Sequence, residues 1–444
     1  MTTARKPHLC VLGMGGSVDE TLASIAPALR ARAPGLRITL IDLQPCHLRA
    51  PGRMHGRAAD HVVPVTPADL GMRTPLSSWS LNLALNGGGL AYRRMVAAAG
   101  RYLADLGADA VLCCHDRHYA ETAFLRAARQ SGVPTVLLQE GPFCVIGHGA
   151  ANHPLLRLKY ALAPLGARLG LLPGMPDYGT FGHDLVMAAS PSYAARWRAV
   201  GVPEERIAVT GIPRYDPLHA AVRPKAGVSS QGKEDAKTAK VCVLLQPFGA
   251  HGKVDAQVAA QGMKDVASGL SEAVARLGFT LFVRPHPRLS TAETQGFTRH
   301  LTVPWTLDDS RRPLVDRLGD LDVVVGFYSS GLLEAAAIGV PAVCFRLPSG
   351  GFAEPGEAAK QDRLAELGLP AVGLPADLGI KIEEALRGVA PETTPEAEIG
   401  RIDGRAATRV AEALAPLLIA GSVRGGAAAV TPEASPPLAA GAAG

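Results

Sequence analysis

Short apolar runs alternate with longer alanine- and leucine-rich stretches along the first half of the chain. The runs have the length and the β-branched content of buried strands, and the stretches between them carry apolar residues at helical spacing. This pattern predicts helices at 21–33 and 120–131 and strands at 8–13, 36–43, 108–114, 134–139, 185–189 and 207–210. Strands separated by helices indicate a parallel sheet that is covered on both faces.

The same alternation returns in the second half of the chain. It predicts a helix at 332–338 and strands at 241–246, 279–284, 323–327 and 342–345. The polar segment Arg223–Lys240 separates the two series and is typical of a linker. We therefore expect an α/β protein with two doubly wound Rossmann-like domains facing a cleft: residues 1–222, a linker at 223–240, residues 241–420, and a disordered Ala/Gly/Pro-rich tail at 421–444.

Composition narrows the possible classes of protein. The 444 residues carry a net charge of only +5, which excludes the strongly basic profile of a dedicated nucleic-acid binder. The seven cysteines form no CxxC pair, and several lie inside apolar runs as reduced cysteines do, so a cytoplasmic location is expected. The longest stretch of low charge, Val323–Phe345, is interrupted by Glu334 and Pro341, so no transmembrane helix is expected.

A histidine flanked by prolines follows the predicted strand at 279–284. The prolines hold His286 in an extended loop, because each proline disfavours helix at the preceding residue. With Arg284 and Arg288 beside it, His286 could bind a phosphate or protonate a departing one. The alternative is an ordinary basic surface loop.

Small hydroxyl residues stand where the strand at 323–327 gives way to the next helix. Ser329, Ser330 and Gly331 would place free backbone N–H groups at a helix start, where the helix dipole favours an anion. Glu334, one turn further on, could accept hydrogen bonds from ribose hydroxyls. A simple serine N-cap is the alternative for the serines.

Glu140 follows the predicted strand at 134–139 and precedes Gly141 and Pro142. A carboxylate at the carboxyl end of a parallel strand faces the ligand-binding edge of the sheet, where it could serve as a general base. The alternative is a loop carboxylate paired with a surface arginine.

Other clusters carry weaker signals. Gly13, Gly15 and Gly16 form a turn that would let an acceptor approach the cleft, but the turn lacks a GxGxxG pattern. His115 and His118 have an HxxH spacing without further ligands, and the Asp320–Asp322 pair runs into a buried strand, so no metal is expected at either. The leucine-rich segment Leu155–Leu172 carries basic residues and could contact a membrane surface.

Taken together, these motifs resemble a known superfamily. GIPRYDPL at 211–218, RPHPR at 284–288, YSSGLLEAAAIGVPAV at 328–343 and DGRAATRV at 403–410 resemble the GT-B enzymes. The order QEG, HP, SS is similar to that of bacterial CMP-sugar-dependent sialyl-, polysialyl- and Kdo-transferases of capsule and lipopolysaccharide synthesis. The resemblance covers roughly residues 135–145 and 207–410.

The resemblance implies a role for each matching residue. Glu140 would deprotonate the acceptor hydroxyl, His286 would stabilise the leaving phosphate, Ser329 and Ser330 would hold it, and Glu334 would bind the ribose. It implies an inverting, metal-independent glycosyltransferase without a cofactor. Its partners would be a nucleotide-sugar donor and a glycan or glycolipid acceptor at the inner face of a membrane, with no nucleic acid. One departure is that position 139 is Gln where the family has an acidic residue.

Three alternatives remain open. UDP-GlcNAc 2-epimerases share the GxPRxD-like, HP, SSG..E and DGxAxxR elements, although their N-terminal GTRPE-type signature is not found here. CDP-glycerol phosphotransferases also use a His-Pro element and a serine pair. A non-catalytic GT-B scaffold would bind a nucleotide or glycan, but it would not need both Glu140 and His286.

Overall fold

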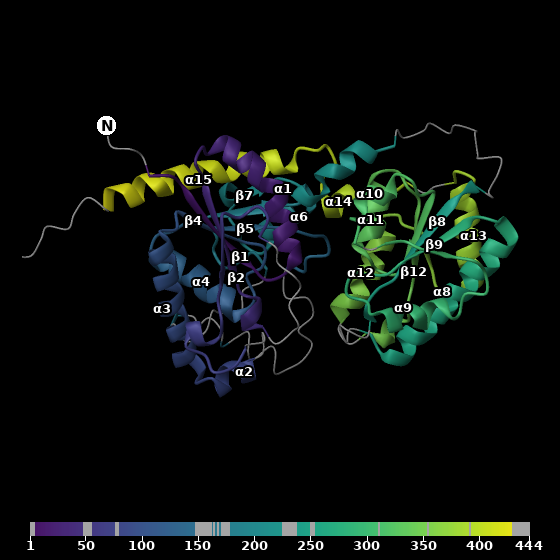
Figure 1. Cartoon of the computed structure of the whole chain (residues 1–444), viewed down its shortest axis with the longest axis horizontal. Coiled ribbons are helices and arrows are strands. Elements are labelled where there is room, and N and C mark those ends of the chain that lie inside the picture. The colour runs from purple at the N-terminus through teal and green to yellow at the C-terminus, as the bar shows by residue number, and fades with distance from the viewer. Residues whose placement is uncertain are drawn as a thin grey trace, which may run out of the picture.

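A computed structural model of the chain describes residues 5–47, 56–75, 80–146, 162, 165–166, 168–169, 178–223, 238–248, 254–309, 311–352, 355–389 and 392–428. Two α/β domains lie side by side, each built on its own parallel sheet (Figure 1). The expected fold class is confirmed, because both sheets are doubly wound and have the strand order of Rossmann-like domains.

The sheet of the first domain has seven parallel strands in the order β3-β2-β1-β4-β5-β6-β7. Their bounds are β1 His8–Gly13, β2 Arg37–Asp42, β3 His61–Pro64, β4 Ala110–Cys113, β5 Thr135–Leu138, β6 Leu185–Ala188 and β7 Ile207–Val209. Six of these strands match the predicted runs to within a few residues. The edge strand β3 was not predicted, because its exposed HVVP sequence lacks the apolar density of its neighbours.

Successive residues of the central strands face opposite sides of this sheet, as strand geometry requires. Leu9 and Val11 face one core, which the helices α1 (Gly16–Arg32) and α15 (Ala406–Ala428) complete. Cys10 and Leu12 face the other core, which α3 (Gly88–Leu106) and α4 (Tyr119–Gln130) cover. The remaining elements of this domain are α2 Ser80–Leu85, α6 Pro191–Ala199, and the 3-10 helices η1 Gln44–Cys46, η2 Ala68–Leu70, η3 Glu204–Arg206 and η4 Pro213–Ala221.

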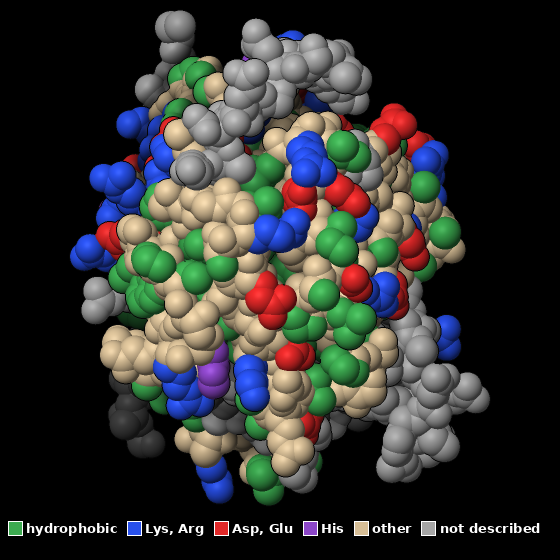
Figure 2. Space-filling model, turned by 90° about the vertical axis from the view of Figure 1, so that its right-hand side faces the viewer, with side chains coloured by type: hydrophobic (Ala, Val, Ile, Leu, Met, Phe, Trp, Pro, Cys, Tyr) green, Lys and Arg blue, Asp and Glu red, His purple; other side chains and the backbone are tan. Residues whose placement is uncertain are grey.

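The sheet of the second domain has six parallel strands in the order β10-β9-β8-β11-β12-β13. Their bounds are β8 Lys240–Leu244, β9 Thr280–Arg284, β10 Thr306–Leu307, β11 Val323–Gly326, β12 Ala342–Phe345 and β13 Ala371–Val372. The surrounding helices are α8 Ala256–Leu277, α9 Thr291–Thr298, α10 Val315–Leu318, α11 Ser330–Ala337, η6 Ser349–Gly351, α12 Pro355–Glu366, α13 Pro375–Leu386 and α14 Glu396–Ile399. Acidic and basic side chains are interspersed over the outer face of this domain (Figure 2), which agrees with the small net charge.

The expected domain bounds need a correction at the C-terminal end. The last helix, α15, returns to the first domain and lies beside α1 (Figure 1). Its side chains Val410, Leu414 and Leu418 are fully buried in the first domain's core. The helix also continues beyond residue 420 to Ala428, where the sequence predicted a tail. Periodicity predicts which residues form a helix, but it cannot show which of two apolar sheet faces that helix covers.

The start of the expected linker already contacts the second domain. Arg223, at the start of the expected linker, already donates through Nη2 to the backbone oxygens of Gly319 (3.0 Å) and Leu321 (2.6 Å) in the second domain. Residues 224–237 of that linker lie outside the described residues.

Among the described helices, α15 contains a window, Ala406–Val423, that is long and apolar enough to cross a membrane by length and composition alone, and 44% of that window is buried.

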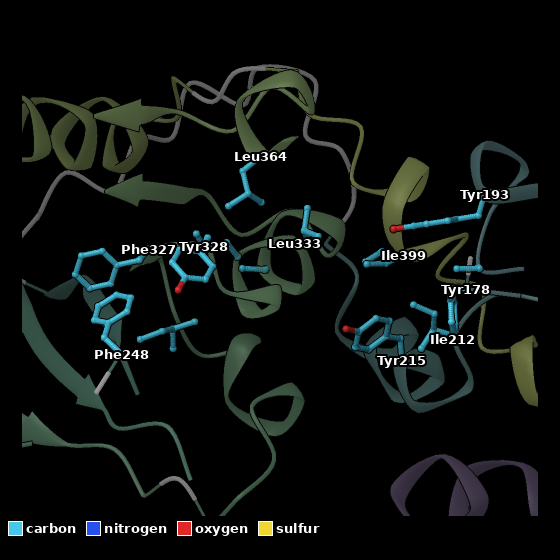
Figure 3. Packing of buried hydrophobic residues seen from close by; sticks show 14 of the residues in the cluster. Tyr178, Tyr193, Ile212, Tyr215, Phe248, Phe327, Tyr328, Leu333, Leu364 and Ile399 are labelled. Atoms are coloured by element: carbon cyan, nitrogen blue, oxygen red, sulfur yellow. The ribbon is translucent and has the colours of Figure 1, made fainter. Parts of the chain in front are cut away.

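The two domains share one continuous apolar junction. Ile399 of α14 lies between Leu333 of the second domain and the tyrosines Tyr178 and Tyr193 of the first (Figure 3). Beside it, the fully buried Glu398 accepts hydrogen bonds from Tyr193 Oη (2.5 Å), Arg363 Nε (2.5 Å) and the Phe143 backbone (3.2 Å). A buried carboxylate with donors from both domains makes α14 the element that joins them.

Candidate active site

Three polar side chains meet at the carboxyl edge of the first sheet. Ser17 follows β1, His115 follows β4 and Glu140 follows β5, and these strands are consecutive neighbours in the order β1-β4-β5. The edge between β1 and β4 is where the strand order reverses, which is the usual ligand position in such a sheet. The three residues are distant in sequence, and the parallel sheet alone brings them together.

Glu140 and His115 form an ion pair. His115 Nε2 lies 3.1 Å from Glu140 Oε1, and Ser17 Oγ donates to the same oxygen at 3.0 Å. The Glu140 side chain is 12% exposed, whereas that of His115 is 44% exposed. The carboxylate is therefore the inner member of the pair, and the imidazole is the outer, more exposed member.

The pair is held in its charged form by mutual attraction. Burial alone would raise the pKa of Glu140, but the hydrogen bond and the charge of His115, with help from Ser17 and Arg214, lower it overall. Burial likewise disfavours the imidazolium, but Glu140, Glu121 and Asp116 together raise the pKa of His115 to about 9. Each member of the pair therefore favours the charged form of the other.

Arg214 connects this pair to the second domain. Its Nε donates to the backbone oxygen of Glu140 at 2.9 Å, and its Nη2 lies 2.8 Å from Tyr215 Oη. Burial disfavours the guanidinium charge, but Tyr215, Glu334 and Glu140 around it raise its pKa. The Tyr215 ring points toward the second domain (Figure 3), so the GIPRYD segment carries polar contacts from one wall of the cleft to the other.

A cavity of about 560 Å³ separates the two walls. Helix α1 contributes Glu20 and Ser24 to it, and η4 contributes Arg214 and Tyr215. The second domain contributes most of the remaining lining: Leu244, Leu245, Arg284, Pro285, His286, Pro287, Arg311, Arg312, Pro313, Leu314, Val315, Asp316, Ser329, Ser330, Gly331 and Glu334. The cavity thus lies at the carboxyl edge of the second sheet, where β8 and β11 mark its reversal of strand order.

The start of α11 forms the floor of this cavity. Ser329 is the N-cap residue, and its Oγ accepts the Gly331 N–H at 3.2 Å. Ser330 Oγ donates to Glu334 Oε1 at 3.2 Å, which ties the serine to a carboxylate that is only 8% exposed. A Cβ at Gly331 would lie 2.6 Å from Leu244 and 2.7 Å from Leu314, so only glycine fits between those side chains. The expected grouping of Ser329, Ser330, Gly331 and Glu334 is therefore present.

His286 lies between two cavities. It lines the large one and also a smaller one of about 260 Å³, together with Ser329 and Ser330. Its Nδ1 accepts the Arg288 backbone N–H at 3.1 Å, which directs the Nε2 edge away from its own loop. The smaller cavity also contains Phe143, three residues after Glu140, together with Tyr328, Glu357 and Lys360. His286 thus borders both cavities.

The two arginines of the His-Pro loop are placed differently from the expectation. Arg284 is buried, and its guanidinium donates to Asp308 Oδ2 at 2.8 Å and to the backbone oxygens of Asp309 and Arg312. Arg284 therefore neutralises a buried carboxylate and supports the 308–312 loop, and its charge is not free for a phosphate. Arg288 is exposed and lies outside the lining of both cavities. Arg311 and Arg312, which the sequence did not single out, line the larger cavity.

The glycine-rich turn after β1 contacts the candidate site through Ser17, at the start of α1. Gly15 is the residue before α1 and has an extended backbone, and a Cβ there would meet nothing within 4 Å. Gly13 ends β1 and Gly16 begins α1, and neither lines a cavity described above. The space around Gly15 would therefore admit a side chain, so nothing in the packing requires a glycine for an approaching acceptor. The residue of this turn that contacts the site is Ser17, which donates to Glu140.

The described residues contain no group of three or more side chains suited to a metal ion. In the HxxH segment, His115 turns to Glu140, and the His118 ring stacks edge-on against His47 with centroids 4.7 Å apart. Asp320 pairs with Arg317 at 3.1 Å, and Asp322 Oδ2 accepts the Lys240 backbone N–H at 2.9 Å. Both aspartates therefore have structural partners.

The GIPRYD and DGRAATR motifs interlock. The two carboxylate oxygens of Asp216 accept the N–H groups of Ala406 (2.9 Å) and Ala407 (2.8 Å) and so cap α15. Arg409 Nε donates to the Thr210 backbone oxygen at 2.7 Å, and its Nη1 pairs with Asp403 at 2.8 Å. These two motifs hold the last helix on the first domain, which explains why they occur together without lining the cleft beyond Arg214 and Tyr215.

No protein-family model matches the sequence, and no curated protein matches it. Solved structures do resemble the fold. A UDP-GlcNAc 2-epimerase from Neisseria meningitidis bound to UDP-GlcNAc has a TM-score of 0.53 at 14% identity over 92% of this chain and 99% of its own. Another UDP-N-acetylglucosamine 2-epimerase has a TM-score of 0.54 at 13% identity, with coverages of 93% and 96%. The S. aureus MnaA–UDP co-structure has a TM-score of 0.53 at 13% identity, with coverages of 91% and 95%.

At these identities the likeness concerns the fold alone. The two parallel sheets, the cleft between their carboxyl edges and the returning C-terminal helix are those of the GT-B fold. The chain therefore has the GT-B fold over nearly its whole length.

Sequence reasoning missed His115 and Arg214. Part of each signal was visible: His115 follows the predicted strand at 108–114, and Arg214 follows the last predicted strand of the first domain. The HxxH spacing was considered only as a metal motif and rejected as one, and GIPRYDPL was used only for the resemblance, because neither pattern shows which side chain reaches Glu140 across the sheet.

Proposed function

We propose that the protein is a glycosyltransferase that moves a sugar from a nucleotide-sugar donor to an acceptor hydroxyl in the interdomain cleft. One observation carries the proposal: the phosphate-compatible start of α11 and His286 line the second-domain wall, while the His115–Glu140 pair stands at the first-domain edge. The second-domain wall suits the donor phosphates, and an acid–base pair suits an acceptor hydroxyl. Two structures of similar fold hold UDP-GlcNAc and UDP.

In this mechanism, one set of residues accepts the acceptor's proton, and another stabilises the negative charge that develops on the leaving phosphate. The acceptor oxygen attacks the anomeric carbon as it loses its proton to the His115–Glu140 side, which inverts the configuration. The bond from that carbon to the phosphate oxygen breaks, and the leaving phosphate gains negative charge. His286, Ser329, Ser330 and the N–H groups at the start of α11 stabilise that charge. Glu334 receives the donor ribose, and no metal is needed to offset the charge.

The donor we propose is a CMP-sugar. The order of the QEG, HP and SS elements, at Glu140, His286 and Ser329–Ser330, is the support for cytidine over uridine. The larger cavity of about 560 Å³ is sufficient for a nucleoside monophosphate, and the smaller one of about 260 Å³ for a single sugar.

The acceptor we propose is a surface polysaccharide or glycolipid at the inner face of a membrane. The support is a set of leucines, each at least half exposed, on the first domain: Leu85, Leu90, Leu162, Leu165 and Leu169. The exposed arginines Arg93, Arg94 and Arg168 lie among them in sequence, and Arg93 donates to the Leu169 backbone oxygen. Exposed apolar side chains beside cations are typical of a surface that binds anionic lipid. Most of Leu155–Leu172 lies outside the described residues.

Ligand-induced stabilisation of the full-length protein tests this proposal. Thermal unfolding is followed with CMP, CDP, UDP and their sugar conjugates, since a ligand that binds the native state raises its melting temperature. Cytidine nucleotides should stabilise the wild type, and Ser330→Ala should weaken the effect. Ser268→Ala, an exposed serine on α8, is the matched control and should behave as the wild type. Stabilisation by none of these nucleotides would contradict the proposal.

A UDP-GlcNAc 2-epimerase-like isomerase is the second candidate, favoured by the TM-scores of 0.53 and 0.54 to such enzymes. The two functions differ in what they need and release. A transferase releases free nucleotide and depends on an acceptor, whereas an isomerase needs no acceptor and keeps the nucleotide–sugar bond. The protein is incubated with UDP-GlcNAc and a chelator but no acceptor, and the products are analysed. This experiment distinguishes the transferase from the isomerase. An isomerised UDP-sugar would replace the transferase proposal.

A further inference from the structure

Both oxygens of Glu140 are already engaged or enclosed by the protein. Oε1 already accepts two hydrogen bonds, from Ser17 Oγ at 3.0 Å and from His115 Nε2 at 3.1 Å. Oε2 is buried from solvent and accepts no hydrogen bond from the residues that the structure describes. An acceptor hydroxyl would have to displace Ser17 or His115 to reach the carboxylate. Glu140 is therefore poorly placed to take a proton from the substrate directly.

His115 has the complementary geometry. Its side chain is 44% exposed, against 12% for Glu140. One ring nitrogen, Nε2, is bound to Glu140, which leaves Nδ1 as the nitrogen that can meet a hydroxyl from the cleft. The ring is supported by Tyr178, whose centroid is 6.4 Å away, and Tyr178 is itself fixed by its hydrogen bond to the Cys114 backbone oxygen at 2.9 Å. The imidazole is thus both oriented and open.

We propose that His115 is the residue that removes the acceptor proton, and that Glu140 is a positioning residue that orients the imidazole and stabilises its charged form. This inference rests on the proposed function and deepens it. In the step, neutral His115 donates Nε2–H to Glu140 and accepts the acceptor's hydroxyl proton on Nδ1. The electron pair of that O–H bond forms the new bond to the anomeric carbon, and the departing phosphate oxygen keeps the electrons of the broken bond. The proton then remains on the imidazolium beside the Glu140 carboxylate.

The charges around the ring determine the pH dependence of this step. Glu140 from the β5 end, Glu121 from α4 and Asp116 from the same loop face the ring, and together with burial they set its pKa at about 9. Glu121 is fully buried, and burial, opposed by His115, raises its own pKa to about 8. Because the base must be neutral to act, turnover should increase as the pH rises toward 9. Without the Glu140 charge, the imidazole should lose its proton at lower pH, by about 1–3 units.

The test combines a titration with kinetics on the full-length protein. The imidazole signals of histidine-labelled protein are followed by NMR against pH, and His115→Gln identifies the His115 signal. Release of nucleotide from the donor that stabilises the protein is measured over the same pH range, with water as the acceptor. The variants are His115→Gln, Glu140→Gln and the double variant, and His61→Gln, an exposed histidine at the start of β3, is the control.

We expect His115→Gln to lower kcat by about 10²–10⁴-fold without changing donor affinity. Glu140→Gln should lower the titration midpoint of His115 and move the rising limb of the pH–rate profile downward with it. The double variant should be no slower than His115→Gln, because Glu140 acts through His115. A merely structural Glu140 would lower stability and leave the midpoint of the pH profile in place.

Two results would overturn the inference while leaving the proposed function intact. The first is near-normal turnover in His115→Gln together with an inactive Glu140→Gln, which would make Glu140 the direct base. The second is a His115 midpoint that is the same in wild type and Glu140→Gln. If the wild type turns over no nucleotide-sugar at all, the proposed function fails and the catalytic role of His115 falls with it, while the NMR midpoint still reports the ion pair.

Discussion

At the scale of single residues, a charged side chain near the cleft can bind substrate or support another charge, and its partners distinguish the two. Glu140 and Arg284 were both expected to meet substrate. Glu140 is enclosed by Ser17 and His115, and Arg284 is enclosed by Asp308 and two backbone oxygens. Arg284 still borders the larger cavity, but its guanidinium is engaged by these partners, whereas Ser330 and His286 border both cavities. The chemistry of the cleft therefore depends on the second pair more directly than on the first.

The contrast between the two walls can be measured with one variant on each. Glu140→Gln should reduce turnover by about 10²–10⁴-fold, because the imidazole of His115 loses the carboxylate that orients it and stabilises its protonated form. Its nucleotide affinity should stay near wild type, since the proposed nucleotide site is on the second domain. His286→Ala should weaken nucleotide binding as well as turnover. Calorimetric Kd values beside kcat decide this, and equal losses of affinity in both variants would contradict it.

Arg284→Ala should destabilise the protein by about 2–3 kcal/mol, because the buried Asp308 loses one of the two arginines that pair with it among the described residues and keeps the more exposed Arg317. Arg288→Ala, an exposed change in the same loop, should stay within about 0.5 kcal/mol of wild type. Urea unfolding followed by circular dichroism measures both. A large loss of nucleotide affinity in Arg288→Ala with unchanged stability would return the phosphate-binding role to this loop.

At the scale of elements, the starts of two helices, α11 and α15, determine where their free N–H groups are used. Helix α11 begins at Ser329 and turns its first N–H groups to the cleft, while α15 begins under the carboxylate of Asp216. Both starts have oxygen acceptors for their free N–H groups, but only the first faces a cavity. A motif at a helix start is therefore functional or structural according to what lies in front of it.

Asp216→Ala should cost about 0.5–2 kcal/mol of stability, because the first N–H groups of α15 lose their cap. The change leaves the cleft side chains in place, so nucleotide affinity should not fall. Asp105→Ala, an exposed aspartate in α3, is the matched control and should have almost no effect on unfolding. If the cap matters only for function, the melting temperatures of both variants will equal that of the wild type.

At the scale of the whole molecule, the chain crosses between the domains twice. It leaves the first domain after η4, builds the second domain, and returns through α14 to place α15 against α1. Gly421 lies so close to Asp109 that a Cβ there would be 2.4 Å from its backbone oxygen. The first domain is therefore incomplete without the C-terminal end of the chain.

Truncation tests this arrangement. Deleting residues 406–444 should unfold or aggregate the protein, because Val410, Leu414 and Leu418 are fully buried and each contributes about 1.5–3 kcal/mol. That sum approaches the whole stability of a typical domain. Deleting residues 429–444 is the control and should leave the melting temperature unchanged. A stable, folded protein ending at residue 405 would show that α15 is dispensable.

Much of the architecture follows from the sequence by itself. The buried strands of both sheets were predictable because parallel strands are apolar on both faces and helices alternate with them. The serines at the start of α11 and the glutamate after β5 were predictable as well, because in such a sheet the loops after strands form the ligand-binding edge. The short edge strands β3, β10 and β13 were not, since their pairing depends on a neighbour already in place.

Only the tertiary structure decided which of those loop residues touch one another. His115 and Glu140 are partners because β4 and β5 are adjacent, and strand order is a property of the folded sheet, which local periodicity does not contain. The same reason applies to Arg284, whose partner Asp308 lies on the loop after the neighbouring strand β10, and to α15, which covers the first domain although it follows the second. Local composition determines what a segment becomes, whereas its partners depend on contacts between segments far apart in the chain.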